Sequence, residues 1–324
     1  MSKPYDPIDN SGIQTSSLSD RESKVSRQDF GKPWQPGGSF SQFLNCLPKF
    51  LAATDILAVI DAVVRAVQNK KPVMWAMGAH VIKVGLNPVL IDLMERGIIS
   101  SLSTNGAAII HDSEIALAGK TSEFVDQSLG SGGFGMAGET ACFLSKAIKD
   151  ADKKDMGLGQ AVGQAILEEG LPHAEDSIFA AGARLDIPMT VHVAMGTDII
   201  HMHPDFDPRA AGAATHRDFL IFAKLVSGLS RGVFLNVGSA VILPEVFLKA
   251  LSLARNLGND VRAFTTVNMD FMRHYRPTVN VVNRPTAEGG QGIHLTGHHE
   301  IMVPLLAAGI LEGLGNFSSK DGKE

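Results

Sequence analysis

The chain has 324 residues, of which 44% are hydrophobic and 19% are charged, and its formal net charge is −5. This length allows one large α/β domain or two smaller ones with a substantial core. A pI near 6.1 provides no basic surface field, so nucleic acids and anionic membranes are not expected as partners. The two cysteines do not form the disulfide framework of a small secreted domain, and the first residues do not resemble a signal peptide. We therefore expect a cytoplasmic protein.

The first 38 residues are rich in Ser, Asp, Lys, Arg, Gly and Pro, which predicts a flexible polar arm. We expect a single α/β domain over residues 39–316 and a polar tail over residues 317–324. Apolar residues recur at three- and four-residue spacing from Ile56 to Val67, which predicts a helix with one buried face. This helix leads into an apolar strand near Val73.

Strand-like and helix-like segments alternate through the rest of the domain. The predicted strands cover residues 72–77, 98–102, 187–193, 232–237 and 261–268. Helical patterns cover residues 114–117, 146–155, 158–167, 176–184, 219–227 and 244–257, and a last helix begins near residue 300. This alternation is typical of a doubly wound, mostly parallel sheet flanked by helices, as in Rossmann-like proteins.

Each predicted strand ends in small or polar residues. The first strand opens into Gly78-Ala79-His80, and the second opens into Ser103-Thr104-Asn105-Gly106-Ala107. The later strand ends are residues 195–198, 236–240 and 265–268. In a parallel sheet these ends meet at one edge, where small residues let backbone amides approach a phosphate or a ring. We therefore predict one ligand cleft lined by several strand ends.

Two glycine-containing runs have features of phosphate-binding turns. Residues 133–138 have the spacing of a dinucleotide fingerprint, but no strand leads into them, so a loop between helices is the better interpretation. Gly238-Ser239-Ala240 follows a strand and precedes a helix opened by Pro244. Its amides and the helix dipole could hold a pyrophosphate, and a plain tight turn is the alternative.

The segment from His201 to Asp207 contains side chains that could bind a divalent ion. His201, His203 and Asp205 would be the ligands of such a site. The direction of the carboxylates is unpredictable after Pro204, so a hydrogen-bonding or substrate-binding loop is an equal alternative. We expect no bound metal and keep this ligand set as the alternative.

Several of these segments occur in the same order in the deoxyhypusine synthase family, which the chain resembles from about Ala58 to Leu314. The resemblance rests on residues 78–112, 187–203, 232–240 and 301–308, and residues 103–108 stand where the family has a Thr-Thr-Ala-Gly-Gly turn. Residues 105–112 also resemble a stretch of archaeal-type ornithine cyclodeaminases. The resemblance implies a deoxyhypusine synthase-like sheet with NAD as cofactor. It also implies a homotetramer, or a dimer, with active sites shared between subunits.

The resemblance also implies roles for single residues. Asp198 would bind the substrate amine, because a carboxylate offsets the desolvation of an ammonium group, and Glu288 is a second candidate. His111, His203 or His298 could transfer protons near neutral pH. The cofactor would contact Thr104, Asn105, Gly106, Ala107, Gly238, Ser239, Thr266, Asn268 and His298.

One departure from the family concerns the reaction. Deoxyhypusine synthases carry a nucleophilic lysine before the final strand, but no lysine occurs between Lys249 and Lys320, and no other lysine is a good candidate. We therefore expect an NAD-dependent enzyme of the transferase or lyase type that removes hydride from a carbon bonded to nitrogen. Its substrate would be a small amine, such as a polyamine, or an amino acid, rather than a protein lysine. A divalent-metal hydrolase and a non-catalytic NAD-binding protein are the alternatives.

Overall fold

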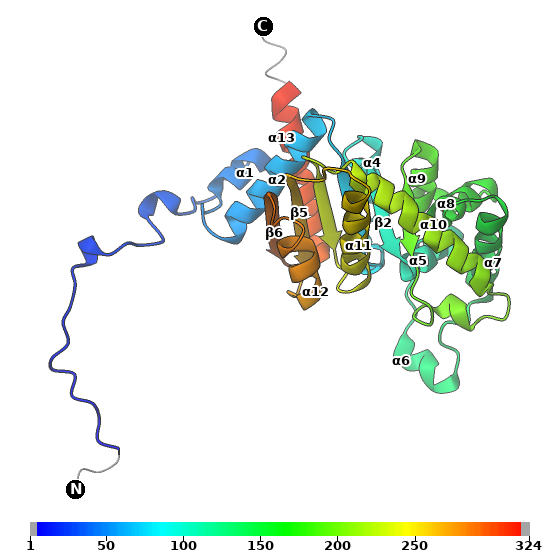
Figure 1. The fold of residues 1–324 in the computed structure, drawn as a ribbon, viewed down its shortest axis with the longest axis horizontal. Coiled ribbons are helices and arrows are strands. Elements are labelled where there is room, and N and C mark those ends of the chain that lie inside the picture. The colour runs from blue at the N-terminus through cyan, green and yellow to red at the C-terminus, as the bar shows by residue number, and fades with distance from the viewer. Residues whose placement is uncertain (1–4, 319–324) are drawn as a thin grey trace.

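The computed structural model describes residues 5–318 and is built around one six-stranded sheet (Figure 1). The strands are β1 (Val73–Met77), β2 (Ser101–Asn105), β3 (Met189–His192), β4 (Val233–Val237), β5 (Phe264–Asp270) and β6 (Gly290–Thr296). Their order across the sheet is β3-β2-β1-β4-β5-β6, and every neighbouring pair is parallel. This order is that of the dinucleotide-binding fold, in which the direction of winding changes between β1 and β4. The doubly wound α/β sheet expected from the sequence is confirmed.

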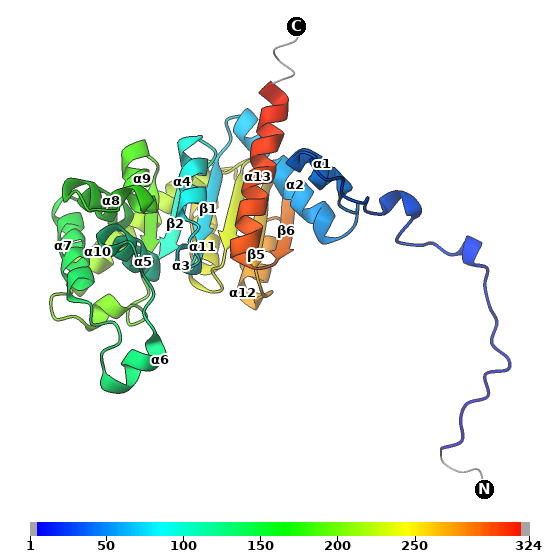
Figure 2. The same cartoon turned by 180° about the vertical axis from the view of Figure 1, so that it is seen from behind.

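Helices cover both faces of the sheet. One face carries α2 (Ala52–Gln68), α4 (Asn87–Glu95), α5 (Gly106–Ala118) and α13 (His299–Ser318), which lie in front of the strands in Figure 2. The other face carries α10 (Pro208–Ser227) and α11 (Ile242–Asn256). Next to β3, α7 (Gly138–Lys153), α8 (Leu158–Glu168) and α9 (Ile178–Leu185) pack together. The shorter helices are α1 (Phe40–Cys46), α3 (His80–Lys83), α6 (Val125–Ser128) and α12 (Tyr275–Pro277). The single turns are η1 (Leu18–Asp20), η2 (Arg27–Asp29), η3 (Leu129–Ser131), η4 (Ala174–Asp176), η5 (Ile199–Met202) and the π-helical η6 (Thr278–Asn283).

Alternate residues of the central strands fill the two layers of core. Trp75 of β1 packs with the helices of one face, whereas Met74 packs with aromatic residues on the other. On that second face the rings of Phe234 and Phe247 are parallel, with centroids 3.8 Å apart. The central strands are thus buried on both sides, as parallel strands covered by crossover helices are. This packing holds the strand ends in a fixed register.

The first part of the described chain lies outside this layered body. Residues 5–38 contain only the two turns η1 and η2 as helical structure and extend away from the sheet (Figure 1). The ring of Trp34 packs edge-on against Phe43 of α1, with centroids 5.9 Å apart, so the last part of the predicted arm contacts the domain. Of the predicted tail, residues 317–318 belong to α13, and residues 319–324 lie outside the described part. Among residues 5–318, no helix is long and apolar enough to cross a membrane.

The structure corrects several predicted boundaries. Strand β2 includes Ser103, Thr104 and Asn105, which the sequence had suggested as a turn, because its pairing with β3 continues to Asn105 and a hydrogen bond also joins side chains of the two strands. This bond joins Thr190 Oγ1 to Ser103 Oγ at 2.8 Å. Helix α10 begins eleven residues earlier than predicted, at Pro208, because Asp207 Oδ1 accepts hydrogen bonds from the first amides of the helix. Strand β5 likewise starts and ends later than predicted, at Phe264 and Asp270.

The sequence analysis did not assign residues to β6, the strand at one edge of the sheet. Its glycine-rich sequence lacks the alternation of a strand, but two of its glycines are required by close backbone approaches. A Cβ on Gly290 would lie 2.4 Å from the carbonyl oxygen of Phe264, and one on Gly292 would lie 2.3 Å from that of Val282. The other glycine-rich run, residues 133–138, lies between η3 and α7, which confirms the predicted loop between helices.

Candidate functional site

The carboxyl ends of the six strands lie along one edge of the sheet, because all strands run in the same direction. In this register Met77 at the end of β1 lies opposite Thr104 of β2 and Val237 of β4. The turns after these three strands are therefore neighbours at the point where the direction of winding changes. Open α/β sheets bind their ligands at this point. We take it as the candidate site.

Two glycines allow the turns after β1 and β4 to touch. A Cβ atom on Gly78 would lie 2.4 Å from the carbonyl oxygen of Gly238. Gly238 has a φ of +66°, and a Cβ atom there would lie 2.5 Å from Nε2 of His299. Any larger residue would force one of these neighbours to shift. The backbones of the two turns and the His299 imidazole are thus in direct contact.

Helix α11 begins just after the Gly238 turn, so its N-terminus lies at the same edge. The turn is fixed by two hydrogen bonds: Leu243 N–H donates to Ser239 Oγ at 3.2 Å, and Asn236 Nδ2 donates to the Ser239 carbonyl at 2.9 Å. In the rest of the first helical turn, Glu245 N–H donates to the Val241 carbonyl at 3.2 Å and Pro244 has no N–H, so Ile242 is the residue whose amide has no intrahelical acceptor. A helix N-terminus of this kind stabilises an anion such as a pyrophosphate.

Two groups beside this turn were not predicted from the sequence. His299 is buried, and its ring lies edge-on to that of His80, with centroids 5.9 Å apart. Burial lowers the pKa of His299 below its ordinary value. Asp270 is buried at the end of β5, and its Oδ2 lies 4.0 Å from Nε2 of His274. The predicted residue, His298, is exposed instead and stacks on Phe271.

Asp198 is a buried carboxylate beside the turn after β2. Its Oδ2 would lie 2.1 Å from a Cβ atom on Gly106, the first residue of α5, so a side chain at that position would force the carboxylate to move. This oxygen is buried and has no hydrogen-bond partner within the described chain. Burial raises the pKa of Asp198 above its ordinary value. The nearby His201 and His111 lower the pKa, but by less than burial raises it. An unpartnered buried carboxylate oxygen is costly, which indicates a ligand that supplies the missing donor.

A pocket of about 190 Å³ opens next to Asp198. Charged and polar groups from several elements line it, among them Lys83, His111, Glu114 and Glu123. Lys83 comes from α3, and no signal in the sequence placed a lysine there. The apolar part of the wall consists of Ala107, Ile110, Val125, Phe134 and Ile199. A second pocket, of about 780 Å³, lies alongside and shares Glu114 and Glu123 with the first.

The side chain of His111 is held at the wall of this pocket by a chain of hydrogen bonds. Its Nδ1 atom lies 2.6 Å from Thr121 Oγ1, and Thr121 Oγ1 donates to Glu114 Oε2 at 2.5 Å. The same carboxylate oxygen lies 3.7 Å from His111 Nδ1. Burial raises the pKa of Glu114, but the nearby imidazole of His111 and the hydrogen bond from Thr121 outweigh this and hold the pKa below its ordinary value.

The structure brings most of the predicted cofactor residues to the carboxyl edge. Asn105, Gly106 and Ala107 form the turn between β2 and α5, next to the turn of Gly238 and Ser239. Thr104, Thr266 and Asn268 lie within strands and are buried. Asn268 Oδ1 accepts a hydrogen bond from Asn236 Nδ2 at 2.8 Å, so it also supports the Ser239 turn. The prediction that these residues contact a cofactor remains a prediction.

Glu288 is not brought to this edge. It precedes β6, so it lies at the amino-terminal edge of the sheet, where Arg262 is 3.8 Å away. A site formed at the carboxyl edge of one chain therefore does not contain Glu288.

The alternative metal ligands do not converge. In the part of the chain that the structure describes, His201, His203 and Asp205 do not bring ligand atoms within 4.8 Å of one another. His201 Nδ1 instead accepts hydrogen bonds from the amides of Gly196 and Asp198, at 3.1 and 3.3 Å. His203 Nε2 donates to the carbonyl oxygen of Gly135 at 2.9 Å. The two histidines thus hold the loop around Asp198 in place.

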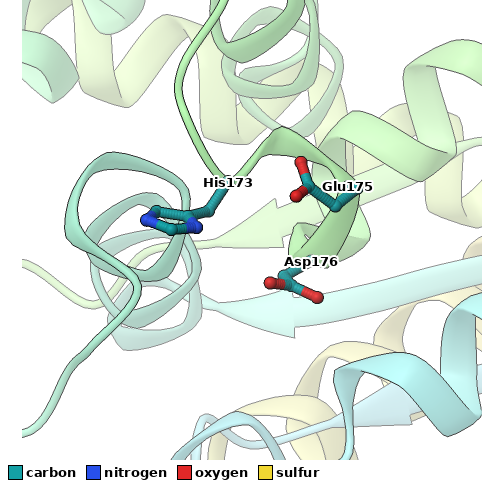
Figure 3. Close-up of side chains that lie close together, drawn as sticks. All are labelled: His173, Glu175 and Asp176. Atoms are coloured by element: carbon teal, nitrogen blue, oxygen red, sulfur yellow. The ribbon is translucent and has the colours of Figure 1, made fainter.

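A different group of potential ligands lies in the turn before α9. Figure 3 shows the side chains of His173, Glu175 and Asp176 close together, and each has a ligand atom within 4.8 Å of the others. Both carboxylates are exposed, and none of the three residues lines the pocket next to Asp198. This cluster is therefore not part of the candidate site.

Comparisons with known proteins support the fold alone. No protein-family model matches the sequence, and a search of curated proteins finds no match. A provisionally assigned deoxyhypusine synthase from Entamoeba histolytica has a TM-score of 0.54 at 12% identity, over 87% of this chain and 96% of that protein. A conserved, provisionally assigned LOR/SDH protein from Methanococcus maripaludis S2 has a TM-score of 0.50 at 17% identity, over 92% and 75% of the two chains.

A third similar structure is that of an AgrE mutant in complex with L-arginine, with a TM-score of 0.50 at 15% identity. The match covers 82% of this chain, but the chain spans only 33% of the length of AgrE. At such identities these structures show that the chain has a deoxyhypusine synthase-like α/β fold, and they leave its activity open.

Proposed function

We propose that the chain is an NAD-dependent enzyme that removes hydride from a carbon bonded to nitrogen in a small amine or amino acid. The observation that carries the proposal is the unpartnered carboxylate oxygen of Asp198 next to the turn of β2. Neighbouring strands are about 4.8 Å apart, so the turns of β2 and β4 are separated by about 10 Å. A single site can therefore hold an amine at Asp198 and a dinucleotide at Gly238.

The turn at Gly238 supports the cofactor half of the proposal. The close contact of Gly78 with Gly238 leaves no side chain between the two backbones, and the dipole at the start of α11, with the amide of Ile242, would favour a pyrophosphate. Bound NAD would supply the hydride acceptor. The chain itself would fix the dinucleotide through backbone groups at Gly238 and Ser239.

The pocket next to Asp198 supports the substrate half. An ammonium group that donates to Asp198 Oδ2 would satisfy the buried oxygen and form a charge-assisted hydrogen bond. Glu114 and Glu123 add negative charge to the same wall, and the volume of about 190 Å³ suits a small head group. AgrE, a protein of this fold, has been crystallised with L-arginine, which is a cationic amino acid.

Two measurements on the full chain test the proposal. Calorimetric titration with NAD⁺ and NADH tests the cofactor, and we expect saturable binding. A screen of polyamines, ornithine and related amines for NADH fluorescence tests the reaction. Binding of NAD without NADH from any amine would favour a non-catalytic NAD-binding protein, and the absence of NAD binding would overturn both assignments.

A further inference from the structure

We infer that His111 is the residue that takes the proton from the substrate ammonium group, through its Nε2 atom, and that Thr121 and Glu114 are positioning residues for it. This inference rests on the proposed function, because it assumes that the amine binds next to Asp198. It selects one of the three histidines that the sequence offered.

The hydrogen bonds around Thr121 determine which ring nitrogen of His111 carries a proton. An ionised carboxylate only accepts hydrogen bonds, so Thr121 Oγ1 gives its one proton to Glu114 Oε2. The hydroxyl oxygen can then only accept from His111 Nδ1, which lies 2.6 Å away. His111 therefore carries its proton on Nδ1 and keeps a free electron pair on Nε2.

Glu114 also stabilises the product of the transfer. When Nε2 takes a proton, the imidazole becomes a cation. The negative charge of the Glu114 carboxylate, 3.7 Å from Nδ1, stabilises this cation. In the transfer an N–H bond of the ammonium group breaks, its proton bonds to Nε2, and the positive charge moves to the ring. The neutral amine that remains has the electron pair needed for loss of hydride from the adjacent carbon.

The position of His111 distinguishes it from the other two histidines. His111 lines the same pocket as Asp198, with Lys83 from α3, Glu114 from its own helix and Glu123 from the segment before α6 as the other charged groups. His203 and His298 do not line this pocket. His203 donates its Nε2 proton to Gly135, and His298 is exposed on the surface of Phe271.

Nitrogen-15 NMR of the full chain tests the hydrogen bonds without any substrate. We expect the His111 signals, assigned with the His111→Gln variant, to show a protonated Nδ1 and an unprotonated Nε2 at neutral pH. The Thr121→Val variant should lose this preference, and Thr121→Ser, which keeps the hydroxyl group, should retain it. A bare Nδ1 in the wild-type protein would overturn the inference.

Kinetics with an amine found by the NADH screen test the role of these residues. His111→Gln should lower kcat at least about 100-fold, as loss of a general base does. Glu114→Gln and Thr121→Val should lower kcat and move the acid limb of the pH profile to lower pH, because the imidazolium loses its counter-charge in the first variant and the hydrogen-bond acceptor of its Nδ1–H in the second. Thr121→Ser should restore both, and Thr140→Val, which removes only a 3.5 Å contact to Glu114 Oε1, should change neither.

The results separate this inference from the proposed function. If Thr121→Val leaves kcat and the acid limb unchanged, or if Thr121→Ser is as impaired as Thr121→Val, the positioning roles are wrong. Calorimetry with NAD⁺ should give the same affinity for all these variants. If the wild-type protein fails to bind NAD⁺ or to oxidise any amine although His111 has the expected tautomer, the proposed function is wrong.

Discussion

Asp112 in α5 and Asp198 beside the first residue of that helix are both buried carboxylates, but their surroundings differ. Asp112 accepts hydrogen bonds from Asn87 Nδ2 and from the Ile178 and Phe179 amides, at 2.9, 3.0 and 3.3 Å, and another from Ser177 Oγ. These bonds join α4, α5 and the start of α9. Asp198, in contrast, has a buried Oδ2 without any partner in the described chain.

The difference separates a carboxylate that builds the fold from one that is available to a ligand. Burial raises the pKa of Asp112 to about 6, even though four hydrogen bonds act in the opposite direction. The same effect of burial raises the pKa of Asp198, but few donors offset it. Removal of Asp112 would leave several buried donors without an acceptor. Removal of the charge on Asp198 would instead take away a buried charge whose Oδ2 has no hydrogen-bond donor in the described chain.

The largest expected effect is on stability. Asp112→Ala should lower the free energy of unfolding by about 3 kcal/mol or more, because it leaves buried amides and Asn87 without an acceptor. Asp198→Asn should change this free energy by less than about 1 kcal/mol or raise it. Urea denaturation of both variants measures the difference, and equal losses of stability would remove the contrast between the two carboxylates.

The next effect is on substrate binding. Asp198→Asn should weaken binding of an amine substrate about 10- to 100-fold, because a charge-assisted hydrogen bond contributes roughly 1.5–3 kcal/mol. The affinity for NAD⁺ should stay the same. Steady-state kinetics with an amine from the NADH screen measure this change, and an unaltered KM and kcat would exclude Asp198 from the site.

A third buried carboxylate, Asp218, combines features of the first two. Its Oδ2 accepts hydrogen bonds from the Gly159 and Val191 amides, at 3.0 and 2.8 Å, but its Oδ1 has no partner in the described chain. Burial raises its pKa to about 7, so the folded state holds this proton more tightly than the unfolded state does. The contribution of Asp218 to stability is therefore full below about pH 4 and is lost as the pH rises to about 7.

The Asp218→Asn variant tests this dependence. Over this pH range the wild-type protein should lose stability relative to the variant, by up to about 1.4 kcal/mol per pH unit. Urea denaturation of both proteins at several pH values gives the difference in slope. Parallel curves would show that Asp218 is ionised in the folded protein like an ordinary carboxylate.

The smallest expected effect concerns Lys83, the exposed cation of the pocket. If the substrate is an amino acid, Lys83→Met should raise its KM a few-fold, because an exposed ion pair contributes at most about 1 kcal/mol. A diamine without a carboxylate should be unaffected or bind slightly better. Comparison of the two substrate types with one variant therefore distinguishes the two substrate classes.

The strands and their shared edge could be predicted from the sequence, because strands buried on both faces have continuous apolar runs that end in small residues. The turn at Gly238 was predicted for the same reason. Residues whose place depends on three-dimensional register were not. The buried hydroxyl of Ser103 in β2 accepts its hydrogen bond from Thr190 of β3, and Lys83 reaches the pocket from a helix after β1, so neither is visible in local sequence.

The places of two predicted site residues depend on elements whose bounds the sequence did not define. Because β6 was not assigned to residues, Glu288 could not be placed at the amino-terminal edge, where the start of β6 puts it. The choice of His298 instead of His299 depended on the phase of α13 at its first residue. Adjacent residues of a helix point about 100° apart, so an error of one position exchanges a buried side chain for an exposed one.

The central claim is that a dinucleotide binds at the turn of Gly238, and calorimetric titration with NAD⁺ tests it most directly. Gly238→Ala and Gly258→Ala both place alanine at a positive φ, of +66° and +87°, but a Cβ atom meets no neighbour within 4 Å at Gly258. We predict that the wild-type protein and Gly258→Ala bind NAD⁺ equally and that Gly238→Ala binds at least about 10-fold more weakly, because even 1.4 kcal/mol of strain in the binding turn has this effect. No binding by the wild-type protein, or equal binding by Gly238→Ala, would contradict the claim.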